Sequence, residues 1–153
     1  MVMKNTVEQL VDIYFRDEWW HSFKMPYPEA INYHYQMLMQ GNIKTIEDLG
    51  IVLGYYEVWL INKEQLNRII LHKPFDARKE DVSSGDIAYL SNLWIDKSFR
   101  KGRVFRELYA KFFEQVNKCQ MVVGEEQPRK GRLRVFKNTK TEQGKWDKTK
   151  VQL

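Results

Sequence analysis

The spacing of the hydrophobic residues between residues 86 and 117 changes partway along the segment. From residue 86 to residue 96 both alternating sets of positions are mostly apolar, which predicts a strand buried on both faces. From residue 104 to residue 116 apolar residues recur every three or four positions, which predicts an amphipathic helix. The basic segment between them contains Gly102 and is predicted to be a turn. Free backbone N–H groups at the start of the helix can then bind an anion, although a plain strand-to-helix connection has the same outline.

Two helices are predicted closer to the N-terminus. The first covers residues 6–23, with Thr6 as its N-cap and apolar side chains along one side. The sequence Met25-Pro-Tyr-Pro ends this helix, because proline cannot continue it. The second helix covers residues 28–40, with a proline in its first turn and Gly41 directly after its last residue.

A β-rich run and a polar loop occupy the middle of the chain. Residues 51–61 are rich in β-branched and aromatic side chains and are predicted to be a strand. Gly54 lies inside this strand, which indicates a β-bulge or a close approach of another backbone. Residues 64–72 fit either a third strand or a short helix. Residues 72–85 contain proline, glycine, serine and mixed charges and are predicted to be a loop.

The composition indicates one soluble, folded domain. The chain has 153 residues, of which 14% are aromatic, enough for a substantial apolar core. Its one cysteine, Cys119, excludes an internal disulfide bond and a zinc site made of cysteines. Neither His21 nor His34 has partners at metal-ligand spacing, so no metal site is predicted. No apolar run is long enough to cross a membrane and the N-terminus lacks a signal-peptide pattern, so we expect a cytoplasmic protein without membrane partners.

Positive charge is concentrated at the C-terminal end. Residues 127–153 contain nine Lys or Arg and two acidic residues, a net charge of +7, whereas the whole chain has a net charge of +5. Such a segment suits a nucleic-acid backbone, an anionic partner protein or the phosphates of coenzyme A, and it also suits a solvated, partly disordered tail. The lysines expected to contact such a partner are Lys137, Lys140, Lys145, Lys148 and Lys150.

The segment from Trp94 to Tyr109 reads Trp-Ile-Asp-Lys-Ser-Phe-Arg-Lys-Gly-Arg-Val-Phe-Arg-Glu-Leu-Tyr and resembles the acetyl-CoA-binding motif of the GNAT acyltransferases. In that family a central strand leads through an arginine and a glycine-rich turn into a helix. Arg100 stands at the place of the leading arginine, and residues 119–123 resemble the strand that follows the helix.

This resemblance implies an α+β fold. It implies a single GNAT-like domain over residues 1–137, in which helices flank a mixed, mostly antiparallel sheet, followed by a basic C-terminal tail over residues 138–153. Within that fold residues 64–72 would form a strand rather than a helix.

The activity that the resemblance implies is transfer of an acetyl group from acetyl-CoA to an amine. Glu57 would remove the amine proton, since a carboxylate among aromatic residues is partly desolvated, and Asp86 and Tyr89 are the other candidates. Alternatively, Glu57 lies on the solvent-facing side of an edge strand. The residues that would bind acetyl-CoA are Leu93, Trp94, Ile95, Arg100, Lys101, Gly102, Arg103, Val104 and Phe105.

The sequence departs from the family pattern at three positions. Arg103 and Phe105 stand where the family has small residues, although Arg103 can still pair with a phosphate. Phe136 stands where many members carry a proton-donating tyrosine on their last helix. These differences predict a degenerate active site. The alternative function is a non-catalytic GNAT-fold module that docks to protein or nucleic acid in an assembly such as a phage particle, which would place the protein inside a virion.

Overall fold

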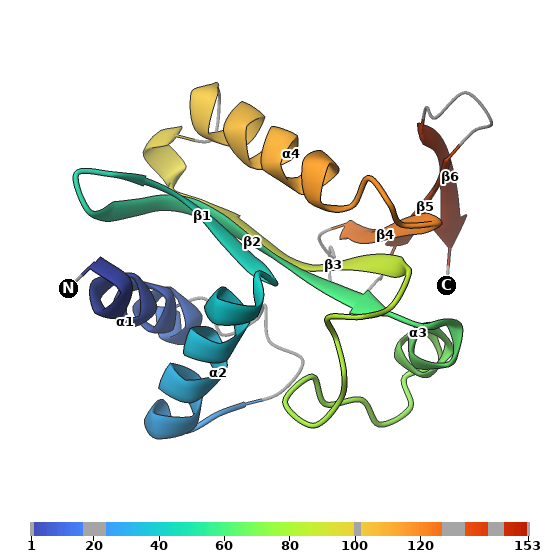
Figure 1. The fold of residues 1–153 in the computed structure, drawn as a ribbon, viewed down its shortest axis with the longest axis horizontal. Helices are drawn as coiled ribbons and strands as arrows, with labels where there is room; N and C mark the ends of the chain where they lie inside the picture. The colour runs from blue at the N-terminus through green and yellow to red at the C-terminus, as the bar shows by residue number, and fades with distance from the viewer. Residues whose placement is uncertain (1, 17–23, 100–101, 127–133, 141–145, 153) are drawn as a thin grey trace. The chain divides into compact units, whose positions relative to one another are not determined.

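The computed structural model describes residues 2–16, 24–99, 102–126, 134–140 and 146–152. Its elements follow one another as α1 (Val2–Arg16), α2 (Tyr27–Gln40), β1 (Ile43–Asp48), β2 (Ile51–Ile61), α3 (Lys63–Ile70), β3 (Ile87–Ile95), the 3-10 helix η2 (Lys97–Phe99), α4 (Arg103–Gln115), β4 (Met121–Glu126), β5 (Arg134–Lys140) and β6 (Trp146–Gln152) (Figure 1). The described residues therefore form an α+β fold, which confirms the predicted fold class.

The strands are hydrogen-bonded in the order β1-β2-β3-β4-β5-β6. The pairs β1 with β2, β4 with β5, and β5 with β6 are antiparallel, whereas β3 and β4 are parallel. The sheet is therefore mixed, as predicted. The parallel pair is connected along the chain by α4, so β3, α4 and β4 make a βαβ unit.

The chain divides into two compact units. Unit 1 contains residues 1–57 and 92–112, and unit 2 contains residues 58–91 and 113–153. Strands β2 and β3 and helix α4 each contribute residues to both units. In unit 1, α1 and α2 lie on one face of the β1–β2 hairpin and α4 lies on the other (Figure 1). Unit 1 thus has helices on both faces of its strands.

Polar and apolar contacts hold α1 on the β1–β2 hairpin. The Gln9 side chain donates to the backbone oxygen of Gly50 at 2.7 Å and accepts from the backbone nitrogen of Val52 at 2.7 Å. Leu10 and Val11, next to Gln9 in α1, are fully buried. One side of α1 therefore closes the core of unit 1, as its apolar spacing predicts.

The predicted N-cap of α1 is wrong. The helix begins at Val2, so Thr6 lies inside it, and its hydroxyl donates to the Glu47 carboxylate on β1 at 3.0 Å. The structure describes α1 as far as Arg16, and the remainder of the helix predicted over residues 6–23 lies outside the described residues.

The β1–β2 hairpin turns at Leu49 and Gly50, which both have positive φ angles, 50° and 78°. Two consecutive residues with positive φ are typical of the tight turns that join antiparallel strands. The sequence pattern does not predict β1, because its buried apolar residues, Ile43 and Ile46, are three positions apart instead of two.

Strand β2 covers the predicted residues 51–61 and contains a β-bulge beside Gly54. Ile46 pairs with Gly54 and Glu47 pairs with Val52, so Leu53 is the extra residue of the bulge. A Cβ on Gly54 would lie 3.0 Å from side-chain atoms of α4 and 3.2 Å from a backbone oxygen of β3. Both expectations for this glycine, a bulge and a close approach, are thus confirmed.

Helix α2 begins and ends close to its predicted positions. A proline occupies its first turn, and Gly41 follows its last residue with a φ of 83°. The Gly41 N–H donates to the Leu38 oxygen at 3.2 Å and so caps the helix. The side of α2 that faces the interior carries Ala30, Tyr33, His34 and Met37.

In unit 2, the segment that the family resemblance assigns to a strand is the helix α3. Asn62 precedes α3, and its side chain accepts from the backbone nitrogen of Gln65 at 2.8 Å. In return, the Gln65 side chain accepts from the backbone nitrogen of Asn62 at 2.9 Å. This reciprocal capping box satisfies two N–H groups at the helix start and favours a helix over a strand.

Arg68 joins α3 to the loop that follows it in unit 2. Its guanidinium pairs with Glu64 at 2.7 Å and with Glu80 of the loop, and it lies 5.5 Å from the centre of the Phe75 ring. The loop then returns to β2, where the backbone nitrogen of Gly85 donates to the Leu60 oxygen at 3.0 Å. The predicted loop is confirmed, and it is fixed at both ends.

Lowering the pH should destabilise unit 2 through Glu80. The hydrogen bond from Arg68 holds the pKa of Glu80 below its ordinary value of 4.5. Because this pKa is lower in the folded than in the unfolded state, the ionised Glu80 carboxylate stabilises the folded state. Its contribution to the free energy of unfolding is complete at neutral pH and is lost as the pH falls through the folded-state pKa. We expect Glu80→Gln to lower the thermal unfolding midpoint slightly at pH 7, because the pair is partly exposed. The substitution should also flatten the loss of stability as the pH falls below 4.5.

Circular dichroism at a series of pH values measures this difference. Glu114→Gln, which changes an exposed glutamate of α4 in the same unit, is the matched control and should behave as the unmodified protein. Identical pH profiles for Glu80→Gln and the unmodified protein would contradict the assignment.

The described part of the basic C-terminal segment is a β-hairpin. Strands β5 and β6 pair along their whole length: Arg134 is paired with Gln152 at one end and Lys140 with Trp146 at the other. Phe136, which the family resemblance places on a last helix, lies on β5 and is paired with Gly124 of β4. That part of the expectation is wrong, because hydrogen bonds to β4 and β6 keep these residues extended.

Candidate functional site

Asp96 shapes the turn that leads from β3 toward α4. Its backbone nitrogen donates to the oxygen of the bulge residue Leu53 at 2.9 Å, which ties the end of β3 to β2. Its carboxylate accepts from the backbone nitrogen of Ser98, and its backbone oxygen accepts from Phe99, each at 2.9 Å. The acidic position of the motif is therefore a structural turn residue.

Gly102 stands directly before α4 and has a φ of 130°, a backbone conformation that residues with a Cβ rarely adopt. Its oxygen accepts from the Arg106 nitrogen at 3.2 Å, so Gly102 occupies the N-cap position. A Cβ on Gly102 would meet no atom of the described part of the chain within 4 Å. The backbone φ angle at this position therefore favours glycine, whereas contacts with the described residues do not require it.

The predicted acetyl-CoA-binding residues differ in their exposure. Ile95 and Val104 are buried, so their side chains belong to the core and only their backbone groups can contact a ligand. Leu93 and Trp94 are half-buried, and the Trp94 ring lies 6.2 Å from the Tyr55 ring. Arg100 and Lys101 lie outside the described residues.

Arg103 and Phe105 are exposed on the first turn of α4. Arg103 lies 3.8 Å from the Glu107 carboxylate, one turn along the helix. The Phe105 ring stacks on Tyr109 with ring centres 5.6 Å apart. Both large residues, at positions where the resemblance implies small ones, therefore contact the following turn of the helix.

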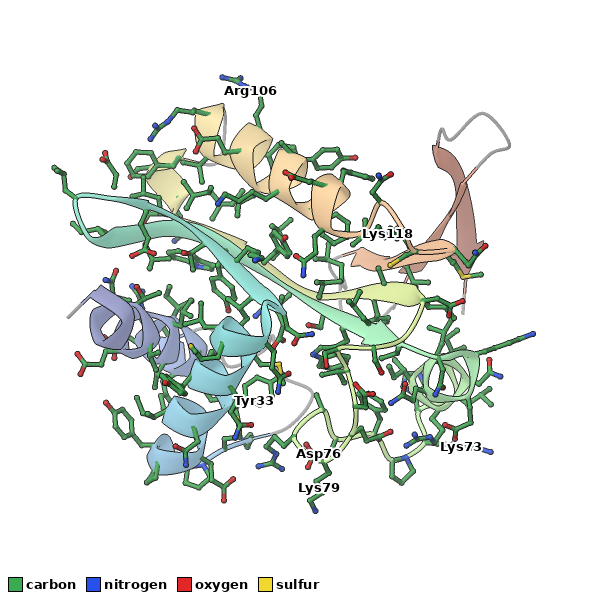
Figure 2. The ribbon with its side chains drawn as sticks, viewed as in Figure 1. Tyr33, Lys73, Asp76, Lys79, Arg106 and Lys118 are labelled. Carbon is green, nitrogen blue, oxygen red and sulfur yellow. The ribbon has the colours of Figure 1, made fainter. Side chains whose placement is uncertain are left out.

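Glu57 is buried on β2, with 7% of its surface exposed. The hydroxyl of Tyr33 on α2 donates to the Glu57 carboxylate at 2.7 Å. Figure 2 labels Tyr33 on this helix. The alternative of a solvent-facing edge strand is wrong, because β2 lies between β1 and β3 and α2 covers Glu57. Sequence reasoning missed Tyr33, since no local pattern pairs it with a glutamate on a distant strand.

A second polar contact lies on the same side of β2 in unit 1. Tyr55 is two residues from Glu57, and alternate residues of a strand point to one face. The Asn92 side chain on β3 donates to the Tyr55 hydroxyl at 2.8 Å. The buried Oδ1 of Asn92 has no hydrogen-bond partner among the described residues. Tyr55 and Asn92 were also missed from the sequence.

His34 packs in the core between α1 and α2. Its Nδ1 lies 2.7 Å from the Ala30 oxygen, and its ring meets the Tyr14 and Tyr33 rings edge-on, with centres 5.6 and 5.4 Å apart. Such packing is typical of a histidine with a structural role.

The other two predicted bases belong to unit 2. Tyr89 is buried, and its ring stacks on Trp59 with centres 5.5 Å apart. Asp86 is exposed, and its backbone oxygen accepts from Gln120 at 2.9 Å. Burial and the nearby Asp86 charge raise the pKa of the Cys119 thiol, so this cysteine stays protonated at neutral pH.

Within the described ranges, no group of three or more His, Cys, Asp or Glu side chains is placed to hold a metal ion. Of the helices in that same part of the chain, none has both the length and the apolar character needed to cross a membrane. Comparisons of the chain with models of protein families, with curated proteins and with solved structures found no match.

Proposed function

We propose that this protein is a GNAT-type N-acyltransferase that binds acetyl-CoA beside the N-terminus of α4 and transfers the acetyl group to an amine. The observation that carries the proposal is the βαβ unit of β3, α4 and β4, in which the helix is entered through a glycine with a φ of 130°. In such units, ligands bind beyond the carboxyl end of a parallel strand, where the N–H groups of the helix begin.

Several residues at this turn fit an anionic coenzyme. Helix α4 begins with Arg103 and has no acidic residue in its first turn, so its unpaired backbone N–H groups favour a phosphate. No atom of the described residues lies within 4 Å of a Cβ placed on Gly102, so those residues leave room for an approaching ligand. The stacking of Phe105 on Tyr109 draws the Phe105 ring toward the second turn of the helix.

Acetyl-CoA would supply an activated thioester, and the chain would supply the proton acceptor. Tyr33 holds the Glu57 carboxylate in one orientation, and Glu57 is the group that would take the proton from the attacking amine. Tyr89 is the other candidate base, although its ring is packed against Trp59 in unit 2. We favour Glu57 because a carboxylate is the better proton acceptor at neutral pH.

Calorimetric titration with acetyl-CoA and with free coenzyme A tests the coenzyme site. We expect saturable binding, and we expect Gly102→Val to weaken it about tenfold or more, because valine cannot adopt a φ of 130° without strain. Gly50→Val is the matched control, since Gly50 also has a positive φ, 78°, and open space around it. This control should retain the affinity of the unmodified protein.

The catalytic role is tested on the same preparations. Glu57→Gln should bind acetyl-CoA as the unmodified protein does and lose acetyl transfer to a panel of primary amines, whereas Tyr33→Phe should lose only part of it. Unchanged transfer by Glu57→Gln would remove Glu57 from the reaction. Equal affinities of Gly102→Val and Gly50→Val would remove the turn from the coenzyme site.

The alternative is a non-catalytic GNAT-fold module that docks into an assembly. The observation that favours it is Phe136, which lies on β5 where the family has a helix that carries a tyrosine acid. Absence of any acetyl-CoA or coenzyme A binding in the titration would favour this alternative over the enzyme. The lysines of the C-terminal segment would then be the first residues to test for contacts with an anionic partner.

A further inference from the structure

We propose that an exposed side of α4 binds single-stranded nucleic acid. The α4 surface consists of Phe105, Arg106 and Tyr109. Phe105 is 42% exposed and Tyr109 is 43% exposed, and their rings are stacked with an interplanar angle of 28°. Arg106 is exposed, and Figure 2 shows its side chain pointing away from the ribbon. Two stacked rings and a guanidinium thus lie together in contact with solvent.

The α4 surface is separate from the side of the helix that packs in the core. The core side of α4 consists of Val104, Leu108 and Phe112, which are all buried. Residues three and four positions apart are neighbours on a helix, so Tyr109 adjoins both Phe105 and Arg106. The apolar residues of the α4 surface are therefore not needed to close the core.

The charge around the α4 surface favours a polyanion. Among the described residues between 97 and 111, Lys97, Arg103, Arg106 and Lys111 are basic and Glu107 is acidic. Glu107 lies 3.8 Å from Arg103, and Lys97, Arg106 and Lys111 are exposed. A second copy of this surface would be repelled by the shared positive charge, whereas phosphate groups would be attracted.

Exposed aromatic rings distinguish a single strand from a duplex. The bases of a single strand can stack on protein aromatic rings, which contributes about 1–3 kcal/mol per base. In a duplex the bases are already stacked on one another, and an α-helix contacts their edges through polar side chains. Because the α4 surface offers two rings and one cation, it suits unpaired bases followed by a phosphate.

Fluorescence anisotropy with labelled oligonucleotides tests the proposal on the full chain. The probes are a single-stranded oligothymidylate of about 15 nucleotides and a duplex of the same length. We expect the single strand to bind more tightly than the duplex at low salt. The double variant Phe105→Ala, Tyr109→Ala should bind the single strand about tenfold or more weakly. Arg106→Ala should reduce the slope of log affinity against log salt concentration by the amount expected for about one phosphate contact.

Conservative and matched variants separate stacking from folding. Tyr109→Phe keeps a ring and should retain affinity. Tyr35→Ala removes a tyrosine of α2 that is 48% exposed, and Lys63→Ala removes an exposed charge of α3. Both controls should bind as the unmodified protein does. Thermal unfolding midpoints establish that every variant is folded at the temperature of the titration.

Three results would overturn the proposal: equal affinity for duplex and single strand, no loss in the double variant, or no binding at low salt. If replacement of Lys145, Lys148 and Lys150 by alanine abolished all binding while the double variant retained it, the C-terminal segment would be the site instead. The outcome is independent of acetyl-CoA binding, because the oligonucleotide assay contains no coenzyme.

Discussion

Gly85→Ala is expected to lower the free energy of unfolding by about 3 kcal/mol or more. A Cβ at this position would come closer than 3.0 Å to the backbone carbonyl carbon and oxygen of Ile61. A side chain could rotate away, but this backbone belongs to β2. The preceding residue, Leu60, is hydrogen-bonded twice to the loop: its oxygen accepts from Gly85, and its nitrogen donates to the Val82 oxygen. Urea denaturation followed by circular dichroism measures the loss.

Gly124→Ala is the matched control for this prediction. Gly124 lies on β4 in the same unit and does not have a positive φ. Among the described residues, nothing lies within 4 Å of a Cβ added to it. Its substitution should change the stability by no more than about 0.5 kcal/mol. If Gly85→Ala were as stable as Gly124→Ala, the close approach of the loop to β2 would not exist in solution.

Leu108→Ala should lower the free energy of unfolding by about 2–5 kcal/mol. Leu108 is 1% exposed on the core side of α4, and its truncation leaves a cavity. Gly54→Ala should cost about 1–3 kcal/mol, because its Cβ would lie 3.0 Å from Leu108 and from Val104. The two substitutions share the same space, so they should compensate each other in part. The second substitution would place a methyl group where the first removed one.

A double-mutant cycle by urea denaturation measures this compensation. In the Leu108→Ala background, Gly54→Ala should cost about 1 kcal/mol less than in the unmodified protein. Leu10→Ala is the control background, since Leu10 is also fully buried but belongs to α1, on the other face of the hairpin. There the two costs should add within about 0.5 kcal/mol. Strict additivity of Gly54 and Leu108 would show that α4 does not pack on this glycine.

Strongly patterned elements were predictable from the sequence. Strand β2 has its predicted ends, and the helices α2 and α4 begin and end within a residue or two of the predicted positions. Their signals are local: a period of two or of three to four residues, a proline in a first turn and a glycine after a last one. The bulge in β2 was also signalled locally, by Gly54 inside a run of β-forming residues.

Elements with weak or competing patterns were missed or misassigned. Strand β1 has too few apolar residues to show a period, and it forms because β2 supplies the hydrogen-bond partners. Helix α3 was assigned to a strand through the family resemblance, although Asn62 and Gln65 carry a capping box in the sequence itself. A local capping signal was therefore more informative here than a distant resemblance.

The candidate site was predictable only in its outline. The glycine turn before α4 and the carboxylate on β2 were identified from their neighbours in sequence. In the structure Gly102 has a φ of 130° and Glu57 is buried. The partners of that carboxylate were not identified. Tyr33 is 24 residues from Glu57 and Asn92 is 37 residues from Tyr55, so each contact depends on how helices and strands pack.

The sequence by itself determined the positions of β2, β3, α2 and α4 and the glycine turn, because these depend on the conformational preferences of residues within a few positions of one another. Only the tertiary structure decided that Glu57 is buried, that Tyr33 holds it, and that Phe105 and Tyr109 are left exposed. Those outcomes depend on which helix or strand packs on each face when distant segments come together. Hydrophobic patterning predicts that a face is buried, but it does not specify which side chains of other segments cover that face.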